Sequence, residues 1–464
     1  MAILFTIEFL LGFWLFFIVY WLLAPLPKIQ NIMLLIVGYY FVYLTGVYSL
    51  LVLLSWSLCV VLIMSLAAQK EWGNKVIGLL VIIMLVYFFV FKYYAPVMDG
   101  VQVFLDKHDI HMPLPIIDIL LPVGMSFYLF NSVSLVQAVV KNEIDKPDFL
   151  SLLLYINFVP TFIAGPVNRA AGLLPQILAP RRIILDFRQA FYLIALALIK
   201  LFLLSAWLTD ELIDPVFNLP DEQNGWDSLI AVYGWAWNIY FNFSGYTNLV
   251  TGIAMLLGYE IPKNFAHPYL AVSLKAFWRD WHISLSTFIR DYIYFPLGGG
   301  RNGFFRTQIN AVIAMVISGI WHGAGMNFLI WGAIHGLGLV IYNIWKRWQP
   351  QDFLYPSFSR LITFHYVCFA WVFFRAASMD DAIAILKNIA HCDLSLITPA
   401  QIWIILFFIL AIVVYPGITN LIRREAGILR SIRWYALPLI IIPALAIAFF
   451  FSPAGVPGFI YASF

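Results

Sequence analysis

Four histidines in the second half of the chain are the residues best suited to acid–base chemistry. They are His282, His322, His335 and His365, and each lies in or against an apolar segment. Where such a segment crosses a membrane, ionisable side chains are costly and usually line a cavity or a pathway. An imidazole has an ordinary pKa of about 6.5 and can exchange a proton near neutral pH. These histidines are therefore the first candidates for a reaction centre.

His322 lies in the segment GIWHGAG, at residues 319–325, within an apolar run too long for one membrane crossing. The glycines predict a break between two helices. Backbone groups freed by such a break are tolerated in a membrane only around a protein-lined cavity. A histidine there suits a general base. It could equally be a structural histidine bonded to a backbone carbonyl, and the local pattern leaves both interpretations open.

His282 lies in the segment FWRDWHISLS, at residues 277–286. We expect residues 274–290 to form one helix, at the cytoplasmic interface or buried in the protein, because they carry too many polar side chains to face lipid. On a helix, Trp278 and His282 are four residues apart and share a face. By itself this pattern favours an interfacial helix with tryptophan anchors over a catalytic segment.

Three further polar features have weaker functional signals. His335 follows His322 by thirteen residues, which would place the two on different faces of a continuous helix, so we expect a packing role for His335. The run PLGGGR, at residues 296–301, lacks the spacing of a nucleotide-binding loop and is more typical of a cytoplasmic turn. The polar residues between positions 242 and 248 could pack helices together or line a tunnel.

The elements that must position these residues are membrane helices. Of the 464 residues, 63% are hydrophobic and 11% are charged, whereas soluble domains carry roughly 25% charged residues. The net charge of +3 is small and no basic run is present, so we expect no nucleic-acid partner. The three cysteines form no pair or cluster with histidine, so we expect neither a metal site nor a disulfide framework.

Apolar runs long enough to cross a bilayer predict about 11–12 transmembrane helices. The first run is interpreted as a membrane helix and not as a cleaved signal, and residues 150–166 are expected to dip into the membrane and return. The runs lie at residues 3–23, 31–48, 50–68, 76–97, 119–140, 189–209, 228–258, 308–345 (two helices), 361–376, 400–422 and 434–451.

Lysine and arginine residues are concentrated in alternate loops, and this pattern gives the orientation of the helices. It places residues 301–306 in the cytoplasm and residues 210–227 outside, with both termini external.

Several of these segments together resemble one family, the membrane-bound O-acyltransferases. The resemblance is to its bacterial branch, which includes the alginate O-acetylation membrane protein and the D-alanyl transfer protein of teichoic acids. The matching stretches are LPVGMSFY at residues 121–128, AGP at 164–166, YFNFSGY at 240–246, NF at 264–265, PY at 268–269, FWRDWHISLSTFIRDYIYFPLGGGR at 277–301, GIWHGAGMNFLIWGAIHG at 319–336 and WVFFRA at 371–376. The resemblance as a whole extends from about residue 30 to residue 390.

The resemblance implies an all-α fold in which membrane helices form a ring around a central tunnel, as one membrane-embedded domain over residues 1–464. It implies that His322 is the histidine required for acyl transfer and that His282 is the second polar residue of the pair. The donor would be a cytoplasmic thioester, acetyl-CoA in alginate-type members or a carrier-protein thioester in D-alanyl members. No tightly bound cofactor is implied.

The expected function is therefore O-acylation of an exopolysaccharide or cell-wall polymer outside a bacterial cytoplasmic membrane. Because the spans use nearly all of this sequence, we expect a separate extracytoplasmic, hydrolase-like partner to acylate the polymer. That partner would contact residues 210–227, 377–399 and 458–464. The alternatives are D-alanyl transfer to teichoic acid, a transporter in which buried histidines relay protons, or a scaffold of a secretion complex.

Overall fold

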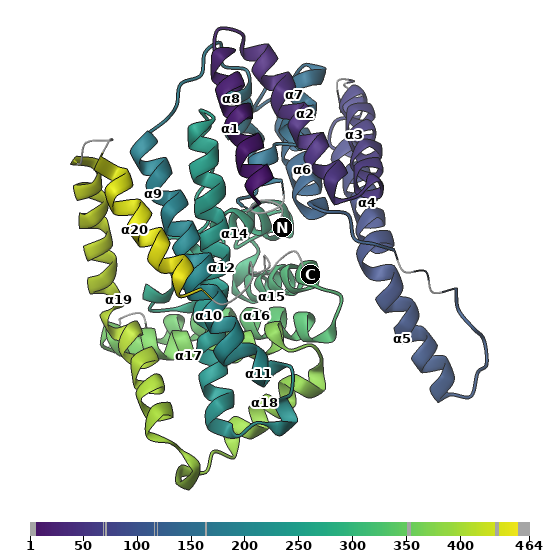
Figure 1. Ribbon diagram of the computed structural model, residues 1–464. Coiled ribbons are helices and arrows are strands. Elements are labelled where there is room, and N and C mark those ends of the chain that lie inside the picture. The colour runs from purple at the N-terminus through teal and green to yellow at the C-terminus, as the bar shows by residue number, and fades with distance from the viewer. Residues whose placement is uncertain are drawn as a thin grey trace. The chain divides into compact units, whose positions relative to one another are not determined.

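The computed structural model describes residues 6–67, 69, 72–115, 117, 119–162, 165–349, 354–431 and 436–452 (Figure 1). Within these residues the secondary structure is helical and contains no strand. The chain divides into two compact units. The first comprises residues 1–186 and 253–262, and the second comprises residues 187–252 and 263–464.

The first unit contains eight α-helices within its described residues. They are α1 (Ile7–Leu22), α2 (Pro27–Thr45), α3 (Val47–Ala67), α4 (Lys75–Phe88), α5 (Tyr94–Lys107), α6 (Met125–Val140), α7 (Phe149–Ile156) and α8 (Ala170–Ile177). A π-helical segment, Phe89–Tyr93, joins α4 and α5 into one rod (Figure 1). The helix α7 has only eight residues, which is too short to cross a bilayer. The predicted dip at residues 150–166 thus begins with a short helix.

The second unit contains His282 and His322. Its α-helices are α9 (Phe187–Leu198), α10 (Ala206–Leu208), α11 (Asp214–Phe217), α12 (Gly225–Leu256, whose last turn belongs to the first unit), α13 (Leu274–Asp280), α14 (Ile283–Ile289), α15 (Gly303–His322), α16 (Met326–Trp348), α17 (Pro356–Arg375), α18 (Met379–Ala390), α19 (Pro399–Ser431) and α20 (Leu437–Phe450). Two π-helical segments, Ile199–Ser205 and Thr209–Ile213, connect α9, α10 and α11 into one long helix.

The prediction of an all-α polytopic membrane protein is confirmed. Within the described residues, seven helices are long and apolar enough to cross a membrane, and five shorter helices of 10–17 residues are also apolar. Each apolar run predicted from the sequence coincides with a helix, and the long run at residues 308–345 is divided into α15 and α16. The ring of helices around a tunnel remains a prediction.

The core of the second unit is largely aromatic. Trp281, Trp331 and Trp371 are among its fully buried side chains, and Phe277 and Phe374 pack with them. Trp331 stacks on Trp371 with 5.9 Å between the ring centroids, and Trp281 lies 5.2 Å from Trp371. Buried aromatic side chains contribute large apolar areas and add specific edge-to-face contacts. They hold together the helices that carry the two histidines.

Candidate active site

The helices α15 and α16 form a hairpin whose turn follows His322. Gly323 is extended (φ −165°, ψ 164°) and ends α15, and α16 begins at Met326. The predicted break at residues 321–325 is therefore confirmed.

Glycines allow the two helices of this hairpin to approach closely. A Cβ atom added at Gly332 would lie 2.5 Å from the carbonyl oxygen of Met315 and 2.9 Å from the Cα of Val316. One added at Gly336 would lie 2.9 Å from the Cα of Val312. Small residues permit such backbone contact between membrane helices. The glycine pattern thus sets where His322 lies relative to α16.

His322 is buried in an aromatic shell. Its ring lies 5.0 Å from Trp331 and 5.0 Å from Phe374, at interplanar angles of 88° and 74°, and 4.7 Å from Trp321. Only 4% of His322 is exposed. These contacts come from α15, α16 and α17, so three helices restrict the orientation of the imidazole. A ring held in this way is suited to proton transfer at one fixed position.

His282 lies at a second helix break, between α13 and α14. It has a left-handed backbone conformation (φ 41°, ψ 53°) and is 1% exposed. Its ring contacts Phe243 of α12 at 4.6 Å and Trp321 at 6.4 Å. Trp321 therefore neighbours both His282 and His322, and the structure brings the two candidate residues together around one indole.

The expectation of a single helix over residues 274–290 is wrong. Backbone groups of residues 280 and 283, which would bond within a continuous helix, bond instead to the loop at residues 264–266. The Ile283 N–H donates to the Asn264 carbonyl at 2.9 Å, and the Ala266 N–H donates to the Asp280 carbonyl at 3.0 Å. Consequently Trp278 and His282 do not share a helical face. Trp278 contacts Trp331 and His335 instead.

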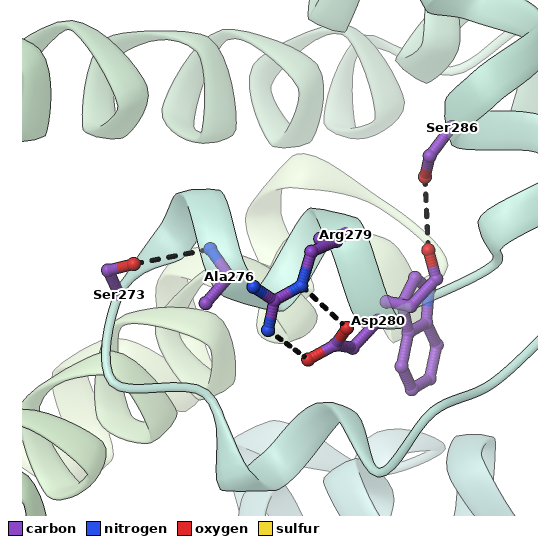
Figure 2. A network of polar contacts seen from close by, with 6 residues as sticks. Ser273, Ala276, Arg279, Asp280 and Ser286 are labelled. Atoms are coloured by element: carbon purple, nitrogen blue, oxygen red, sulfur yellow. Dashed lines mark hydrogen bonds and ion pairs between the residues drawn. The ribbon is translucent and has the colours of Figure 1, made fainter.

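Local polar contacts delimit α13 and the start of α14 (Figure 2). The Ser273 hydroxyl accepts from the Ala276 N–H at 3.2 Å and caps α13. The Ser286 hydroxyl donates to the Trp281 carbonyl at 3.0 Å. Arg279 and Asp280 form an ion pair, which contributes little because Arg279 is 73% exposed. The hydrogen bonds to Ser273 and Trp281 thus define the segment better than the ion pair does.

Buried polar side chains stand next to His282. Ser284 donates to Asn264 Oδ1 at 2.6 Å, and Asn264 Nδ2 donates to Thr247 Oγ1 of α12 at 3.5 Å. Burial lowers the pKa of His282 to about 3 from its ordinary value of 6.5. The imidazole is therefore neutral at physiological pH and can orient a polar group without carrying charge.

The other two histidines occupy different surroundings. His335 is fully buried on α16, and its ring lies 4.9 Å from Trp331, the same indole that contacts His322. His322 ends α15 and His335 lies on α16. The prediction that they occupy different faces of one continuous helix therefore does not apply. His365 is exposed on α17, where its Nε2 pairs with the Tyr233 hydroxyl at 2.7 Å and its Nδ1 pairs with the Leu361 carbonyl.

The run at residues 296–301 forms a tight turn. Gly298 and Gly299 have positive φ angles of 107° and 56°, and Asn310 Nδ2 donates to the Gly299 carbonyl at 3.0 Å. Such a turn agrees with the structural interpretation of this glycine run. Among the described residues, no group of three or more His, Cys, Asp and Glu side chains is placed to hold a metal ion.

Sequence reasoning assigned no role to Trp321, Trp331, Phe374 or Asn264, although all four lie in the motifs that carry the family resemblance. The signal that could have identified them is that they are aromatic or amide residues within these motifs. Which of them contact the histidines depends on the crossing of α12, α15, α16 and α17. That information is tertiary and is not contained in the local spacing.

Comparison with known proteins shows which family and which relatives this chain resembles. The model of the MBOAT family, the membrane-bound O-acyltransferases, matches residues 35–379. The chain is 34% identical over 298 residues to a probable alginate O-acetylase of Azotobacter vinelandii, covering 63% of this chain and 58% of that protein.

Two further relatives carry different names. A peptidoglycan O-acetyltransferase of Helicobacter pylori is 34% identical over 52% of this chain and 46% of its own length. A teichoic acid D-alanyltransferase of Bacillus subtilis is 27% identical over 54% of this chain and 68% of its own length. The chain spans about half the length of most of the relatives that it matches. The matched family region contains both His282 and His322.

Proposed function

We propose, on the premise that this chain belongs to the membrane-bound O-acyltransferase family, that it transfers an acyl group from a thioester to a hydroxyl. The observation that carries the proposal is the placement of His282 and His322, both buried and both beside Trp321. Similarity to two O-acetylating relatives at 34% identity favours acetyl as the acyl group.

In the proposed mechanism, His322 is the general base. It removes the proton from the acceptor hydroxyl while the hydroxyl oxygen attacks the thioester carbonyl carbon. The new C–O bond forms, the C–S bond breaks, and the proton held by His322 passes to the leaving thiolate. The aromatic shell around His322 excludes water and so favours transfer over hydrolysis of the thioester.

His282 is proposed to orient the thioester or to stabilise the oxyanion that develops on the carbonyl oxygen. Its neutral imidazole can donate one hydrogen bond from a buried position, where such a bond is stronger than in water. Asn264 and Ser284 hold the backbone around His282. This role is electrostatic and positional, whereas His322 exchanges a proton.

The proposed donor is cytoplasmic acetyl-CoA, used as a substrate and not as a bound cofactor, and the proposed acceptor is an exopolysaccharide or cell-wall polymer outside a bacterial cytoplasmic membrane. This direction follows from the lysine and arginine loop pattern. Single cysteines placed within residues 210–227 and 301–306 should label from opposite sides of intact cells. Labelling of both from one side would refute the proposed orientation.

A separate extracytoplasmic partner is proposed to deliver the acyl group to the polymer. Two of the segments predicted to contact it lie together in the second unit. Asn388 of α18 donates to the Pro220 carbonyl at 2.8 Å, and the Trp226 indole donates to the Asp393 carbonyl at 2.8 Å. Residues 210–227 contain six carboxylates and no lysine or arginine, which suits a basic partner surface. Residues 458–464 lie outside the described residues.

A second candidate function is D-alanyl transfer from a carrier-protein thioester, which the similarity to the Bacillus subtilis relative favours. The test is reconstitution of the purified chain in liposomes, with either acetyl-CoA or a D-alanyl carrier protein inside and a glycan outside. Acetyl transfer that is lost in His322→Ala supports the first proposal, and transfer only from the carrier protein supports the second. Absence of both in the presence of a cell-envelope extract would favour a transporter or a scaffold.

The same liposomes test the partner. We expect little acylation of a long polymer until an extracytoplasmic fraction is added, because a hydrated polymer is too polar to enter an apolar helix bundle without compensating hydrogen bonds. Efficient acylation by the purified chain alone would show that no partner is needed.

A further inference from the structure

His335 is a buried polar side chain that the proposed mechanism does not use. It is 0% exposed, and neither ring nitrogen has a hydrogen-bond partner among the described residues. Its closest ring neighbours are Trp331 at 4.9 Å and Trp278 at 5.0 Å. The Tyr366 ring is also near, at 6.4 Å, but its hydroxyl donates to the Ile334 carbonyl at 2.6 Å. The proton of this hydroxyl is therefore already engaged elsewhere.

The indoles around His335 share this property. The N–H groups of Trp278, Trp331 and Trp371 have no hydrogen-bond partner among the described residues. The Trp371 ring lies 6.4 Å from His335 and stacks on Trp331. Buried polar groups in folded proteins are nearly always hydrogen-bonded to protein, water or a ligand. Four neighbouring rings with no hydrogen-bond partner in the described part of the chain therefore indicate a place where another molecule supplies the partners.

The chemistry of these rings specifies the molecule. An indole N–H only donates, and a neutral imidazole donates once and accepts once. The cluster thus offers four donors and one acceptor. Its complement is rich in oxygen acceptors, has at least one N–H or O–H, and carries no charge, because the rings of the cluster supply no charge to pair with it. A secondary amide has this combination of a carbonyl and an N–H.

The position of the cluster relates it to the reaction centre. Trp331 contacts both His335 and His322. Along α16, His335 lies on the side of Trp331 toward Lys346 and Arg347, whose positive charges predict that this end of the helix is cytoplasmic. A thioester that enters from that side would meet the His335 cluster before it reaches His322.

We propose that His335, with the indoles of Trp278, Trp331 and Trp371, binds an amide of the pantetheine arm of the acyl thioester donor. The proposal rests on the proposed function and names the part of the donor that this cluster recognises. His335 would bind the donor while His322 performs proton transfer. Both acetyl-CoA and a carrier-protein thioester contain this arm, so the site would serve either donor.

The competing explanation is that His335 only fills space. The two explanations differ in the donor binding that they predict for His335→Leu, which keeps most of the volume but removes both nitrogens. If the nitrogens have no partner, an apolar replacement raises the midpoint of thermal unfolding or leaves it unchanged. If they bind the donor, the replacement weakens donor binding. His335→Gln retains a donor and an acceptor and should preserve much of the binding.

The experiment measures binding without turnover and then turnover. The thermal midpoint of the purified protein in nanodiscs is recorded with and without CoA, and with and without pantetheine, which lacks the nucleotide and phosphates. The KM for acetyl-CoA is measured in parallel. Loss of about one neutral hydrogen bond corresponds to roughly a 10-fold weaker affinity. We therefore expect His335→Leu to raise KM about 10-fold, with a smaller change in kcat, and to abolish the pantetheine shift.

Trp371→Phe removes one indole N–H and should raise KM by a smaller factor. A matched control is Trp235→Phe, which removes another buried indole N–H that has no partner among the described residues but does not contact His335. It should leave KM and the pantetheine shift unchanged. If His335→Leu does not fold, His335→Gln and Trp371→Phe provide the same comparison.

A wild-type pantetheine shift and KM that survive in His335→Leu would overturn the His335 proposal and leave the proposed function intact. Absence of acyl transfer from any thioester by the wild-type protein would instead refute the proposed function. A wild-type protein that transfers acyl groups but shows a shift with CoA and none with pantetheine would place recognition on the nucleotide, and would also overturn the role of His335.

Discussion

His322 and His282 both lie buried at helix breaks, but the two breaks are made by different physical means. The break after α15 is local, because glycines at residues 319, 323 and 325 surround His322, and Gly319 lies against the backbone of α16. The break before α14 is tertiary, because the Asn264 carbonyl accepts from the Ile283 N–H and the Ala266 N–H donates to the Asp280 carbonyl. His282 is left with a positive φ angle of 41°.

This difference separates the two histidines functionally. The imidazole of His322 is held by aromatic rings from three helices and can move a proton without moving itself. The orientation of His282 depends on a loop and on a strained backbone, since a left-handed residue other than glycine costs about 1–2 kcal/mol. We therefore expect substitutions at the first break to affect chemistry and those at the second to affect geometry. Substitutions at four positions test this distinction.

The largest expected effect is that of His322→Ala. Removal of a general base typically lowers the rate by about 10²–10⁴-fold. We expect the acyl-transfer rate of this variant to fall by at least about 10²-fold. The amount of folded protein in the membrane should be unchanged. The matched control is His365→Ala, which removes an exposed histidine bonded to Tyr233 and should retain activity. Normal acylation by His322→Ala would show that the first break is only structural.

The next effect is expected at Gly332, where a methyl group would collide with the backbone of α15. The added Cβ would lie 2.5 Å from the Met315 carbonyl oxygen, so the helices must separate. Overpacking of this kind costs about 1–3 kcal/mol, and a displacement of His322 by about 1 Å can cost about 10²-fold in rate. We expect Gly332→Ala to lower both the thermal midpoint and kcat.

Gly78→Ala is the control for that substitution. Gly78 lies inside α4, and no atom stands within 4 Å of an added Cβ. Alanine in a helix interior is favoured over glycine by about 0.5–1 kcal/mol, so Gly78→Ala should be neutral or slightly stabilising. Equal behaviour of the two glycine variants would contradict the close approach of α15 and α16.

A smaller effect is expected at His282, and two variants separate its ring from its backbone. His282→Ala removes the ring and keeps the strained φ angle, whereas asparagine tolerates the left-handed conformation and can still donate a hydrogen bond. We expect alanine to lower kcat/KM about 10-fold, as for loss of one buried hydrogen bond, and asparagine to restore part of it. The measurement is donor dependence in the liposome assay.

The pH profile gives a further readout for His282. Because its pKa is lowered to about 3, the neutral ring is present throughout pH 5–8, and protonation becomes significant only as the pH falls toward 3. His282→Asn should therefore change the height of the pH–rate profile between pH 5 and 8 but not its shape. A shift of the profile along the pH axis would mean that His282 itself exchanges the proton.

The contrast between the two breaks also explains how much could be predicted from the sequence. Hydropathy and glycine content are local properties, and they predicted the helices and the separation of α15 from α16 at His322. The helix expected over residues 274–290 is interrupted by the bond from Ile283 to Asn264, which lies nearly twenty residues earlier in the chain. The periodicity of a helical pattern cannot predict a contact with so distant a residue. For the same reason the sequence placed His282 beside Trp278, whereas the structure places it beside Phe243 and Trp321.

The role of His335 shows the same limit. Its sequence position suggested packing, because thirteen residues separate it from His322. Only the antiparallel hairpin of α15 and α16 places Trp331 against both rings. Spacing along one helix could not reveal this, since His322 ends the first helix and His335 belongs to the second.

The smallest expected effect is that of Ser284→Ala, which tests whether the second break is held by side chains as well as by the backbone. The Ser284 hydroxyl donates to the Oδ1 of Asn264 at 2.6 Å, and Asn264 is 1% exposed. Its removal leaves a buried acceptor without this donor, which costs about 1–3 kcal/mol. The backbone bond from Ile283 to Asn264 remains, so His282 should keep its place.

We therefore expect Ser284→Ala to have a lower thermal midpoint with only a few-fold loss of activity. The exposed control is Ser65→Ala, whose hydroxyl bonds the Val61 carbonyl in its own helix, and it should show no change. A loss of activity as large as that of His282→Ala would mean that the side-chain bond, and not the backbone bond, positions His282.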